Sequence, residues 1–215
     1  MRLDSYLVEM GDLGSRGRAK RAIEEGNVKV NGTVIMKPSY DVAYCDLVEV
    51  TQDMDKPGGY WKLKDIQEKT GIIKNGDRVL DIGSSAGGFL LFASEIASHV
   101  HGVEFSREFR TELGKIEHEH PNITVEFDDV FTMPFEKEKF DVLLMDITAD
   151  PLSSIKALEN TLPALKSGGV LMQVLKLPKK KEREPILRKL SSLGLEIIDV
   201  LEPEKKEAYF IARKL

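Results

Sequence analysis

The sequence predicts an α/β protein, in which a mostly parallel sheet with helices on both faces follows a small α+β domain. From residue 60 onward, short apolar strands alternate with helical segments, which is the pattern of a parallel sheet whose crossover connections are helices. Before residue 53, two segments of helical periodicity precede an alternating run around Asn31-Gly32, a dipeptide typical of tight β-hairpins. A chain of 215 residues is long enough for one sizeable core and a small second one.

Three regions are expected along the chain. Residues 1–52 form the small domain, residues 53–59 form a linker that ends in Pro-Gly-Gly, and residues 60–215 form the larger domain. This division separates the hairpin-containing region from the region of alternating strands and helices.

The small domain is expected to contain two helices, a hairpin over residues 28–35 and a third strand over residues 46–51. Ser15 is a suitable N-cap for the second helix, and Gly26 is expected to end it. The residues of the two helices that recur at helical spacing or face inward are Leu3, Tyr6, Leu7, Met10, Ala19, Ala22 and Ile23.

The larger domain is expected to contain seven strands and four helices. The strands cover residues 78–82, 99–105, 123–127, 140–146, 169–176, 195–201 and 207–214. The helices cover residues 87–98, 107–119, 151–165 and 181–193. A short turn around Pro203 joins the last two strands, which should therefore form an antiparallel pair at one edge of the sheet.

The composition excludes several classes of protein. With 31% charged and 41% hydrophobic residues the chain is typical of globular proteins, and its net charge of -5 argues against indiscriminate coating of nucleic acid. No apolar run approaches the length of a membrane helix, and no secretory signal is evident. The single Cys45 cannot form an internal disulfide, and the four histidines show no zinc-binding spacing. These observations favour a cytoplasmic protein without a metal centre.

The second helix concentrates positive charge. Arg16, Arg18, Lys20 and Arg21 fall within six residues, and like charges three or four residues apart repel one another on a helix. Either this helix presents a solvated charged face, or a ligand with negative charge lies against it.

A glycine-rich turn follows the first strand of the larger domain, in the segment VLDIGSSAGGF at residues 79–89. Such a turn lets backbone N–H groups approach a ligand closely. Its spacing matches neither the dinucleotide-binding fingerprint nor a phosphate-binding P-loop. Glu104 ends the next strand, where its carboxylate could accept both ribose hydroxyls, and Asp129 follows the third strand, where it could accept from an adenine amino group. Together these residues predict a nucleoside-bearing cofactor.

The glycine-rich segment resembles motif I of the S-adenosylmethionine-dependent methyltransferases, and its Gly-Gly-aromatic ending is similar to that of the FtsJ-type ribose methyltransferases. The resemblance implies a Rossmann-like methyltransferase sheet, with S-adenosyl-L-methionine as cofactor. It places Gly87 and Phe89 beside the cofactor, Glu104 at its ribose and Asp129 near its adenine. The complete set of cofactor-binding residues that it implies is Asp81, Gly83, Ser84, Ser85, Ala86, Gly87, Gly88, Phe89, Glu104, Asp129 and Asp146.

FtsJ-type enzymes use a Lys-Asp-Lys-Glu set, and this chain has a candidate at each place. The segments YWKLKDI, LLMDI, QVLKL and KKEAYF supply Lys62, Asp146, Lys176 and Glu207 in that order. Lys64 is an alternative to Lys62, which the aromatic-Lys-Leu context favours. Two departures from the family pattern occur outside this set: the proline that often follows the aspartate closely comes later, at Pro151, and Phe89 stands where some loops have tryptophan.

The chemistry of methyl transfer explains these residue types. A ribose 2′-hydroxyl is a poor nucleophile, so its proton must leave as attack proceeds, and a neutral lysine could accept it. A free lysine with a pKa of about 10.4 is already protonated at neutral pH, but a second ammonium nearby disfavours its charge. On this hypothesis Lys176 is the base, Lys62 tunes it and positions the substrate, and Asp146 and Glu207 orient the amines.

The first fifty residues resemble an S4 domain, a small RNA-binding module, through RLDSYLVEMG, SRGRAKRAIEEGNVKVNG and KPSYDV. The basic helix of that module lies on RNA phosphates, which would supply the missing negative charge. The RNA-binding residues expected in this chain are Arg2, Arg16, Arg18, Lys20 and Arg21, together with Lys179, Lys180 and Lys181 beside the active site.

An S4 domain followed by an FtsJ-type domain is the architecture of the TlyA-type proteins, which are rRNA ribose 2′-O-methyltransferases. The resemblance implies RNA as partner, with rRNA of a ribosomal subunit or its precursor as substrate. Three alternatives belong to other classes: an RNA-binding protein whose methyltransferase fold no longer turns over, a haemolysin-like membrane-active protein, and an S4-linked pseudouridine synthase. The last lacks support, because nothing in residues 60–215 resembles the catalytic domain of such a synthase.

Overall fold

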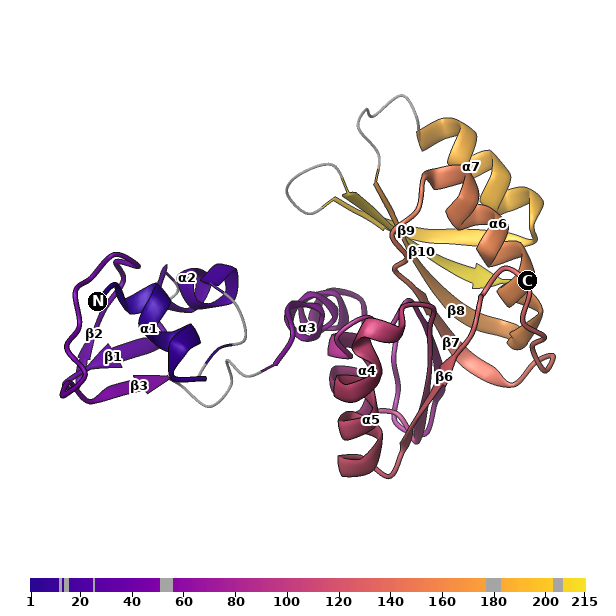
Figure 1. Cartoon of the computed structure of the whole chain (residues 1–215). Coiled ribbons are helices and arrows are strands. Elements are labelled where there is room, and N and C mark those ends of the chain that lie inside the picture. The colour runs from indigo at the N-terminus through magenta and orange to yellow at the C-terminus, as the bar shows by residue number, and fades with distance from the viewer. Residues whose placement is uncertain (12, 14–15, 25, 51–55, 177–182, 203–206) are drawn as a thin grey trace. The chain divides into compact units, whose positions relative to one another are not determined.

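A computed structural model of the chain describes residues 1–11, 13, 16–24, 26–50, 56–176, 183–202 and 207–215. The chain divides into two compact units, Met1–Pro57 and Gly58–Leu215 (Figure 1). The first unit has one buried apolar cluster and the second unit has two.

The first unit packs two helices on a three-stranded antiparallel sheet with the order β2-β1-β3. Its elements are α1 (Leu3–Glu9), α2 (Arg16–Glu24), β1 (Val28–Val30), β2 (Thr33–Val34) and β3 (Val48–Val50). Six of the seven residues expected to face inward are buried in its core. Met10 is the exception: it follows the last residue of α1 as its C-cap and is exposed. The expected N-cap, Ser15, lies outside the described residues.

The hairpin around Asn31-Gly32 is confirmed. Asn31 and Gly32 have φ of 51° and 78°, and Val30 pairs with Thr33 across the turn. Positive φ at both central residues is what a two-residue hairpin turn requires, because its twist then matches that of the strands. Asn31 also fixes the approach to β3, since its side-chain oxygen accepts a hydrogen bond of 2.9 Å from the Leu47 N–H.

The second unit is built on a seven-stranded sheet with the order β6-β5-β4-β7-β8-β10-β9. Its strands are β4 (Arg78–Ile82), β5 (His99–Glu104), β6 (Ile123–Phe127), β7 (Phe140–Met145), β8 (Leu165–Lys176), β9 (Leu195–Leu201) and β10 (Glu207–Lys214). The first five are parallel, whereas β10 is antiparallel to both β8 and β9. The predicted α/β fold is therefore confirmed, with the last two strands at one edge.

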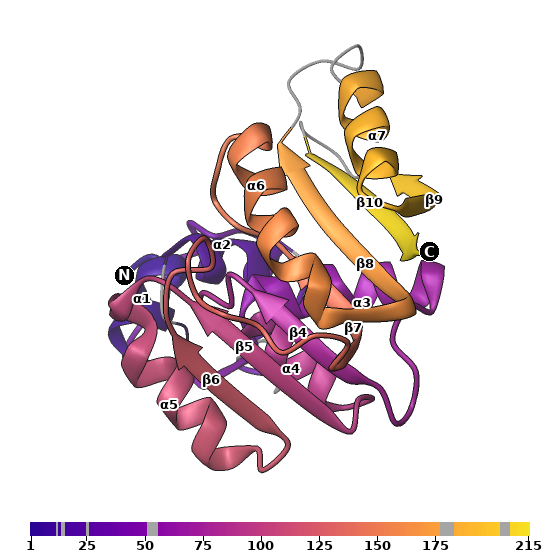
Figure 2. The ribbon, with the colours of Figure 1, turned by 90° about the vertical axis from the view of Figure 1, so that its right-hand side faces the viewer.

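Helices cover both faces of this sheet (Figures 1 and 2). One face carries α3 (Gly58–Thr70), α4 (Gly88–Ser94) and α5 (Arg110–Glu119), and the other carries α6 (Pro151–Thr161) and α7 (Arg183–Ser192). Each face buries its own apolar cluster, as expected for a parallel sheet covered on both sides. The expected helix 87–98 is shorter than predicted, because α4 ends at Ser94.

Helix α3 is the element that the sequence does not predict. Its first two residues, Gly58 and Gly59, fall in the expected linker, and glycine is a poor helix former. Tyr60, Leu63 and Ile66 recur every third residue along α3, and all three are buried in the apolar cluster that α3 shares with α4. Packing against α4 rather than intrinsic propensity therefore stabilises α3.

The α3–α4 contact depends on a glycine. A Cβ atom on Gly88 would lie 2.5 Å from the backbone nitrogen of Tyr60 and 2.8 Å from the Cα of Gly59. We expect Gly88→Ala to lower the free energy of unfolding by about 1–3 kcal/mol, because the two helices must separate to admit the methyl group. Urea denaturation of the full chain measures this change.

Gly114 provides the matched control. It lies within α5, and a Cβ atom there would meet nothing within 4 Å. Gly114→Ala should therefore raise the free energy of unfolding by about 0.5–1 kcal/mol, the ordinary helix-propensity gain. Equal effects of the two substitutions would contradict the close approach of α3 and α4.

Candidate active site

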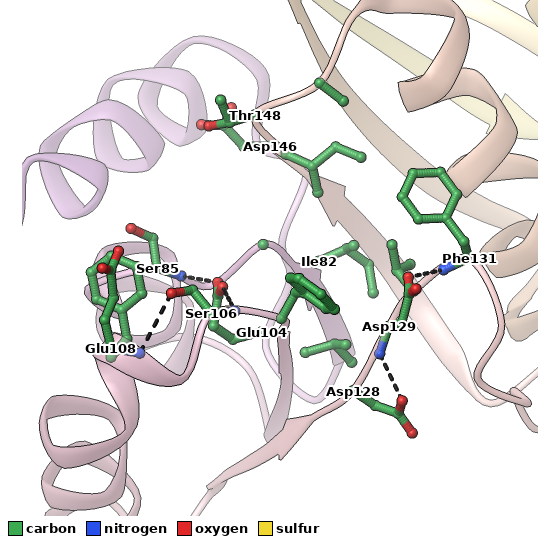
Figure 3. A pocket seen from close by; sticks show the side chains of 17 residues that line it. Ile82, Ser85, Glu104, Ser106, Glu108, Asp128, Asp129, Phe131, Asp146 and Thr148 are labelled. Atoms are coloured by element: carbon green, nitrogen blue, oxygen red, sulfur yellow. Dashed lines mark hydrogen bonds between the residues drawn. The ribbon is translucent and has the colours of Figure 1, made fainter.

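A cavity of about 510 Å³ lies at the carboxyl ends of β4, β5, β6 and β7 (Figure 3). The strands β5 and β6 lie on one side of β4 and β7 lies on the other, so the cavity occupies the point where the strand order reverses. Open α/β sheets bind ligands at such a point. Five residues of the predicted cofactor set line the cavity: Gly83, Ser85, Glu104, Asp129 and Asp146.

Glu104 is held rigidly at the cavity wall. Its Oε2 accepts a hydrogen bond of 2.7 Å from the Ser85 N–H, and its Oε1 accepts one of 2.7 Å from the Ser106 N–H (Figure 3). The carboxylate thus ties the turn after β4 to the turn after β5. Each oxygen keeps a lone pair for a further donor, which fits the two hydroxyls of a ribose.

Asp129 and two aromatic rings form another part of the wall. Asp129 Oδ1 accepts a hydrogen bond of 2.9 Å from the Phe131 N–H (Figure 3), and Phe131 and Phe105 both line the cavity with exposed rings. Exposed aromatic rings beside a carboxylate suit a flat heteroaromatic ring such as adenine. The predicted set omits both phenylalanines, although Phe105 directly follows Glu104 in the sequence and could have been found there.

Gly83 brings two turns into contact. Its φ is +86°, and a Cβ atom there would lie 2.8 Å from the Asp146 carbonyl oxygen and 3.0 Å from Ile147. Only glycine therefore allows the backbone after β4 to pass this close to the backbone after β7.

The second half of the glycine-rich loop packs against helices and does not line the cavity. Phe89, expected beside the cofactor, is buried among the side chains of α3 and α4. Gly87 has a φ of +78° as the N-cap of α4, and a Cβ atom there would overlap Ile116 of α5. The residues of the predicted cofactor set that lie outside the cavity lining are Asp81, Ser84, Ala86, Gly87, Gly88 and Phe89.

Asp81 is a buried carboxyl group beside the cavity. Neither of its side-chain oxygens has a hydrogen-bond partner among the described residues. Burial, with smaller contributions from the negative charges of Asp146 and Glu104, raises the pKa of Asp81 to about 7. A positively charged cofactor in the neighbouring cavity would favour the ionised form of this carboxyl group.

A second cluster of charged side chains adjoins the cavity. Lys62 of α3 places its Nζ 2.8 Å from Asp146 Oδ2 and 3.2 Å from Glu207 Oε2. The Tyr209 hydroxyl donates to the same Glu207 oxygen at 3.3 Å, and Lys62 Nζ lies 4.9 Å from the centre of the Tyr209 ring. Burial lowers the pKa of Lys62, but the carboxylates of Asp146 and Glu207 outweigh burial, so its pKa is raised. Lys62 is therefore an ammonium in this cluster.

The other two lysines of the prediction lie differently. Lys64 places its Nζ 5.2 Å from the centre of the Trp61 ring, so of the two alternatives on α3 it is Lys62 that contacts Asp146. Lys176 ends β8 and pairs directly with Glu207 across the antiparallel ladder. Directly opposite residues of such a ladder project from the same face of the sheet. Lys176 is exposed, and its side chain makes no hydrogen bond or ion pair within the described part of the chain.

The expected RNA-binding residues of the first unit are accessible. Arg2, Arg16, Lys20 and Arg21 are exposed, and Arg18 is half-buried. Asp4 lies opposite two of them, at 2.8 Å from Arg2 and 3.2 Å from Arg16. The predicted lysines at 179, 180 and 181 lie outside the described residues.

The described ranges of the chain contain no group of three or more His, Cys, Asp or Glu side chains that could hold a metal ion. Nor do they contain a helix that is long and apolar enough to span a membrane.

Each of the two units matches the model of a known protein family. The S4 domain model matches residues 1–48, and the FtsJ-like methyltransferase model matches residues 58–215. The chain belongs to the FtsJ-like methyltransferase family. The predicted order of an S4 domain and an FtsJ-like domain is thereby confirmed.

Two curated relatives of this FtsJ-like methyltransferase are informative. It is 31% identical over 182 residues to ribosomal RNA large subunit methyltransferase E of Syntrophobacter fumaroxidans. This match covers 72% of this chain and 87% of that relative. It is 34% identical over 91 residues to the 16S/23S rRNA (cytidine-2′-O)-methyltransferase TlyA of Mycobacterium tuberculosis. The second match covers 41% of this chain and 34% of TlyA.

Among solved structures, the fibrillarin of Aeropyrum pernix with natively bound S-adenosyl-L-methionine is similar to this chain, with a TM-score of 0.59 and 24% identity. The similarity covers 72% of this chain and 75% of the fibrillarin. At this identity the comparison shows that the two proteins share the methyltransferase fold.

Proposed function

We propose that this protein transfers the methyl group of S-adenosyl-L-methionine to a ribose 2′-hydroxyl of ribosomal RNA. The observation that carries the proposal is the charged cluster around Lys62. Its Nζ lies 2.8 Å from Asp146 Oδ2 and 3.2 Å from Glu207 Oε2. Asp146 also lines the cavity, so one carboxylate connects the charged cluster to the cofactor site. The names of both curated relatives describe methylation of rRNA, and that of TlyA specifies the 2′-oxygen of cytidine.

The cavity residues suit the cofactor. When bound, S-adenosyl-L-methionine supplies an electrophilic methyl group on a positively charged sulfur. In this assignment Glu104 binds the ribose hydroxyls of the cofactor, and Asp129 with the exposed rings of Phe105 and Phe131 binds its adenine. The buried carboxyl of Asp81 favours the positive charge.

The charged cluster suits the substrate. Lys176, in its neutral form, would accept the proton of the 2′-hydroxyl at its Nζ, which would leave the ribose oxygen able to attack the methyl group that the cofactor would supply. Lys62 remains protonated, because Asp146 and Glu207 hold its proton, and its ammonium orients the substrate and tunes Lys176 electrostatically. Because the proposed reaction is a displacement between two groups that the protein holds in place, much of the rate acceleration comes from positioning these groups.

The first unit serves as the RNA-binding module in this proposal. Its exposed arginines contact phosphates, and residues 53–59 form the linker to the catalytic domain, with Gly58 and Gly59 also beginning α3. The lysines at 179, 180 and 181, which follow Lys176 closely in the sequence, are further candidates for phosphate contacts in this proposal. The substrate is a ribosomal subunit or its precursor in the cytoplasm.

Incubation of the full chain with labelled S-adenosyl-L-methionine and purified ribosomal subunits tests the proposal. The expected product is a methylated nucleotide whose 3′-phosphodiester resists alkaline cleavage, because cleavage requires a free 2′-hydroxyl. RNA binding without label transfer would favour the non-catalytic RNA-binding alternative, and lysis of lipid vesicles without label transfer would favour the membrane-active alternative.

Lys176→Ala tests whether Lys176 is the base. We expect it to lower methyl transfer by about 10²–10⁴-fold, because the 2′-hydroxyl loses its proton acceptor. Lys156→Ala is the control, since it removes an equally exposed lysine from α6, outside the cluster. A Lys176→Ala variant with unchanged activity would remove Lys176 from the mechanism.

A further inference from the structure

The first unit contains a buried carboxylate that joins two arginines of different elements. Asp4 lies in the first turn of α1, and its side chain is 5% exposed. Its Oδ1 accepts from Arg2 Nε at 3.0 Å, and its Oδ2 accepts from Arg2 Nη2 at 2.8 Å. Arg16, the first residue of α2, donates from Nη2 to the same Oδ2 at 3.2 Å.

The two arginines keep most of their donors for another ligand. Each guanidinium has five N–H groups, and the bonds to Asp4 occupy two from Arg2 and one from Arg16. Both side chains remain open to solvent, with exposed fractions of 52% for Arg2 and 62% for Arg16. Two guanidinium groups thus meet at one carboxylate, and more than half of each arginine side chain is exposed to solvent.

A solvated charged face does not require this arrangement. Exposed arginines that only need water gain nothing from a common buried partner, whereas burying a carboxylate is costly unless it is paired. The Arg2 guanidinium, and then that of Arg16, hold the pKa of Asp4 well below its usual range, so the carboxylate keeps its charge at neutral pH. One negative charge against two positive charges also leaves a net positive charge at the surface.

We propose that Asp4 is a positioning residue that holds Arg2 and Arg16 as a clamp for RNA phosphate, an inference that rests on the RNA binding proposed for this unit. Planar guanidinium donors match phosphate oxygens in geometry. The carboxylate offsets the repulsion between the two cations and fixes their side chains before RNA arrives. Binding then costs less side-chain entropy than it would for two free arginines.

Neutralising Asp4 provides a test in which two hypotheses predict opposite changes in the affinity for RNA. If only net charge matters, Asp4→Asn strengthens RNA binding, because it removes a negative charge from a basic surface. If Asp4 positions the arginines, the variant weakens binding by about 2- to 10-fold, since asparagine has no negative charge to offset the repulsion between the guanidinium groups and has an NH2 donor in place of one acceptor oxygen. The measurement is the dissociation constant of the full chain for fluorescently labelled rRNA fragments.

Glu24→Gln is the matched control. It neutralises an exposed acid on the same basic helix, paired with Lys20 at 3.8 Å and in contact with neither clamp arginine. This variant should bind RNA as tightly as the wild type or more tightly. Thermal denaturation of both variants checks that the first unit remains folded.

Arg16→Lys provides a second test that keeps both the charge and the carboxylate. Arg16→Lys should also weaken RNA binding. The slope of log Kd against log salt concentration should become shallower by the amount that one phosphate contact contributes. RNA binding that is unchanged or tighter in both Asp4→Asn and Arg16→Lys would overturn the clamp while leaving RNA binding intact. Absence of RNA binding by the wild-type chain would overturn the clamp together with the RNA-binding role of the first unit.

Discussion

Lys62→Ala should lower the rate of methyl transfer by about 10²–10³-fold while leaving the fold intact. In the proposed mechanism the Lys62 ammonium orients the substrate and tunes Lys176 electrostatically, and removing one such electrostatic group has effects of this size. The substitution also leaves Asp146 and Glu207 without the cation that lies 2.8 Å and 3.2 Å from them. Single-turnover transfer of labelled methyl to ribosomal subunits measures the loss.

Lys64→Ala is the control for this experiment. Lys64 belongs to the same helix, but its ammonium lies over Trp61 rather than beside Asp146. The control should retain methyl transfer within about threefold of the wild type, since the half-buried Lys64 does not line the cavity, and a substitution outside the site changes free energies by about 0.5 kcal/mol. If Lys64→Ala lost activity and Lys62→Ala did not, the assignment of the two lysines would be reversed.

Glu104→Ala should weaken the binding of S-adenosyl-L-methionine by about 10²–10⁴-fold. Hydrogen bonds to a charged group contribute about 1.5–3 kcal/mol each, and the variant loses those proposed for the ribose hydroxyls. It also releases the Ser85 and Ser106 N–H groups, each of which donates to Glu104 at 2.7 Å. Isothermal titration calorimetry with the cofactor measures the change without any RNA substrate.

Glu126→Ala controls for the loss of negative charge. Glu126 lies on β6 beside Val103 of β5, but it is exposed and does not line the cavity. Its removal should leave cofactor affinity nearly unchanged. An affinity for the cofactor that is the same in wild type and Glu104→Ala would show that the ribose lies elsewhere.

The sequence by itself determined the features that depend on neighbours along the chain. Asn31-Gly32 specifies a hairpin because these two residues tolerate the positive φ that the turn requires. The alternation of apolar strands with helices specifies a parallel sheet, and the carboxyl ends of parallel strands meet at one edge. Glu104, Asp129 and Asp146 could therefore be assigned to a common site before any coordinates were known.

Tertiary structure alone decided which side chains meet across long separations in sequence. Lys62 is 84 residues from Asp146 and 145 residues from Glu207, and the choice between Lys62 and Lys64 depends on which face of α3 the packing against α4 turns inward. Helix α3 itself begins with two glycines and forms because its apolar side chains are buried, which local propensity does not encode. Likewise, the glycine-rich loop reads as one motif, yet only its first half reaches the cavity, because the second half is occupied by contacts with α3 and α5. Local conformational preferences act over a few residues, whereas close packing between elements sets the geometry of the site.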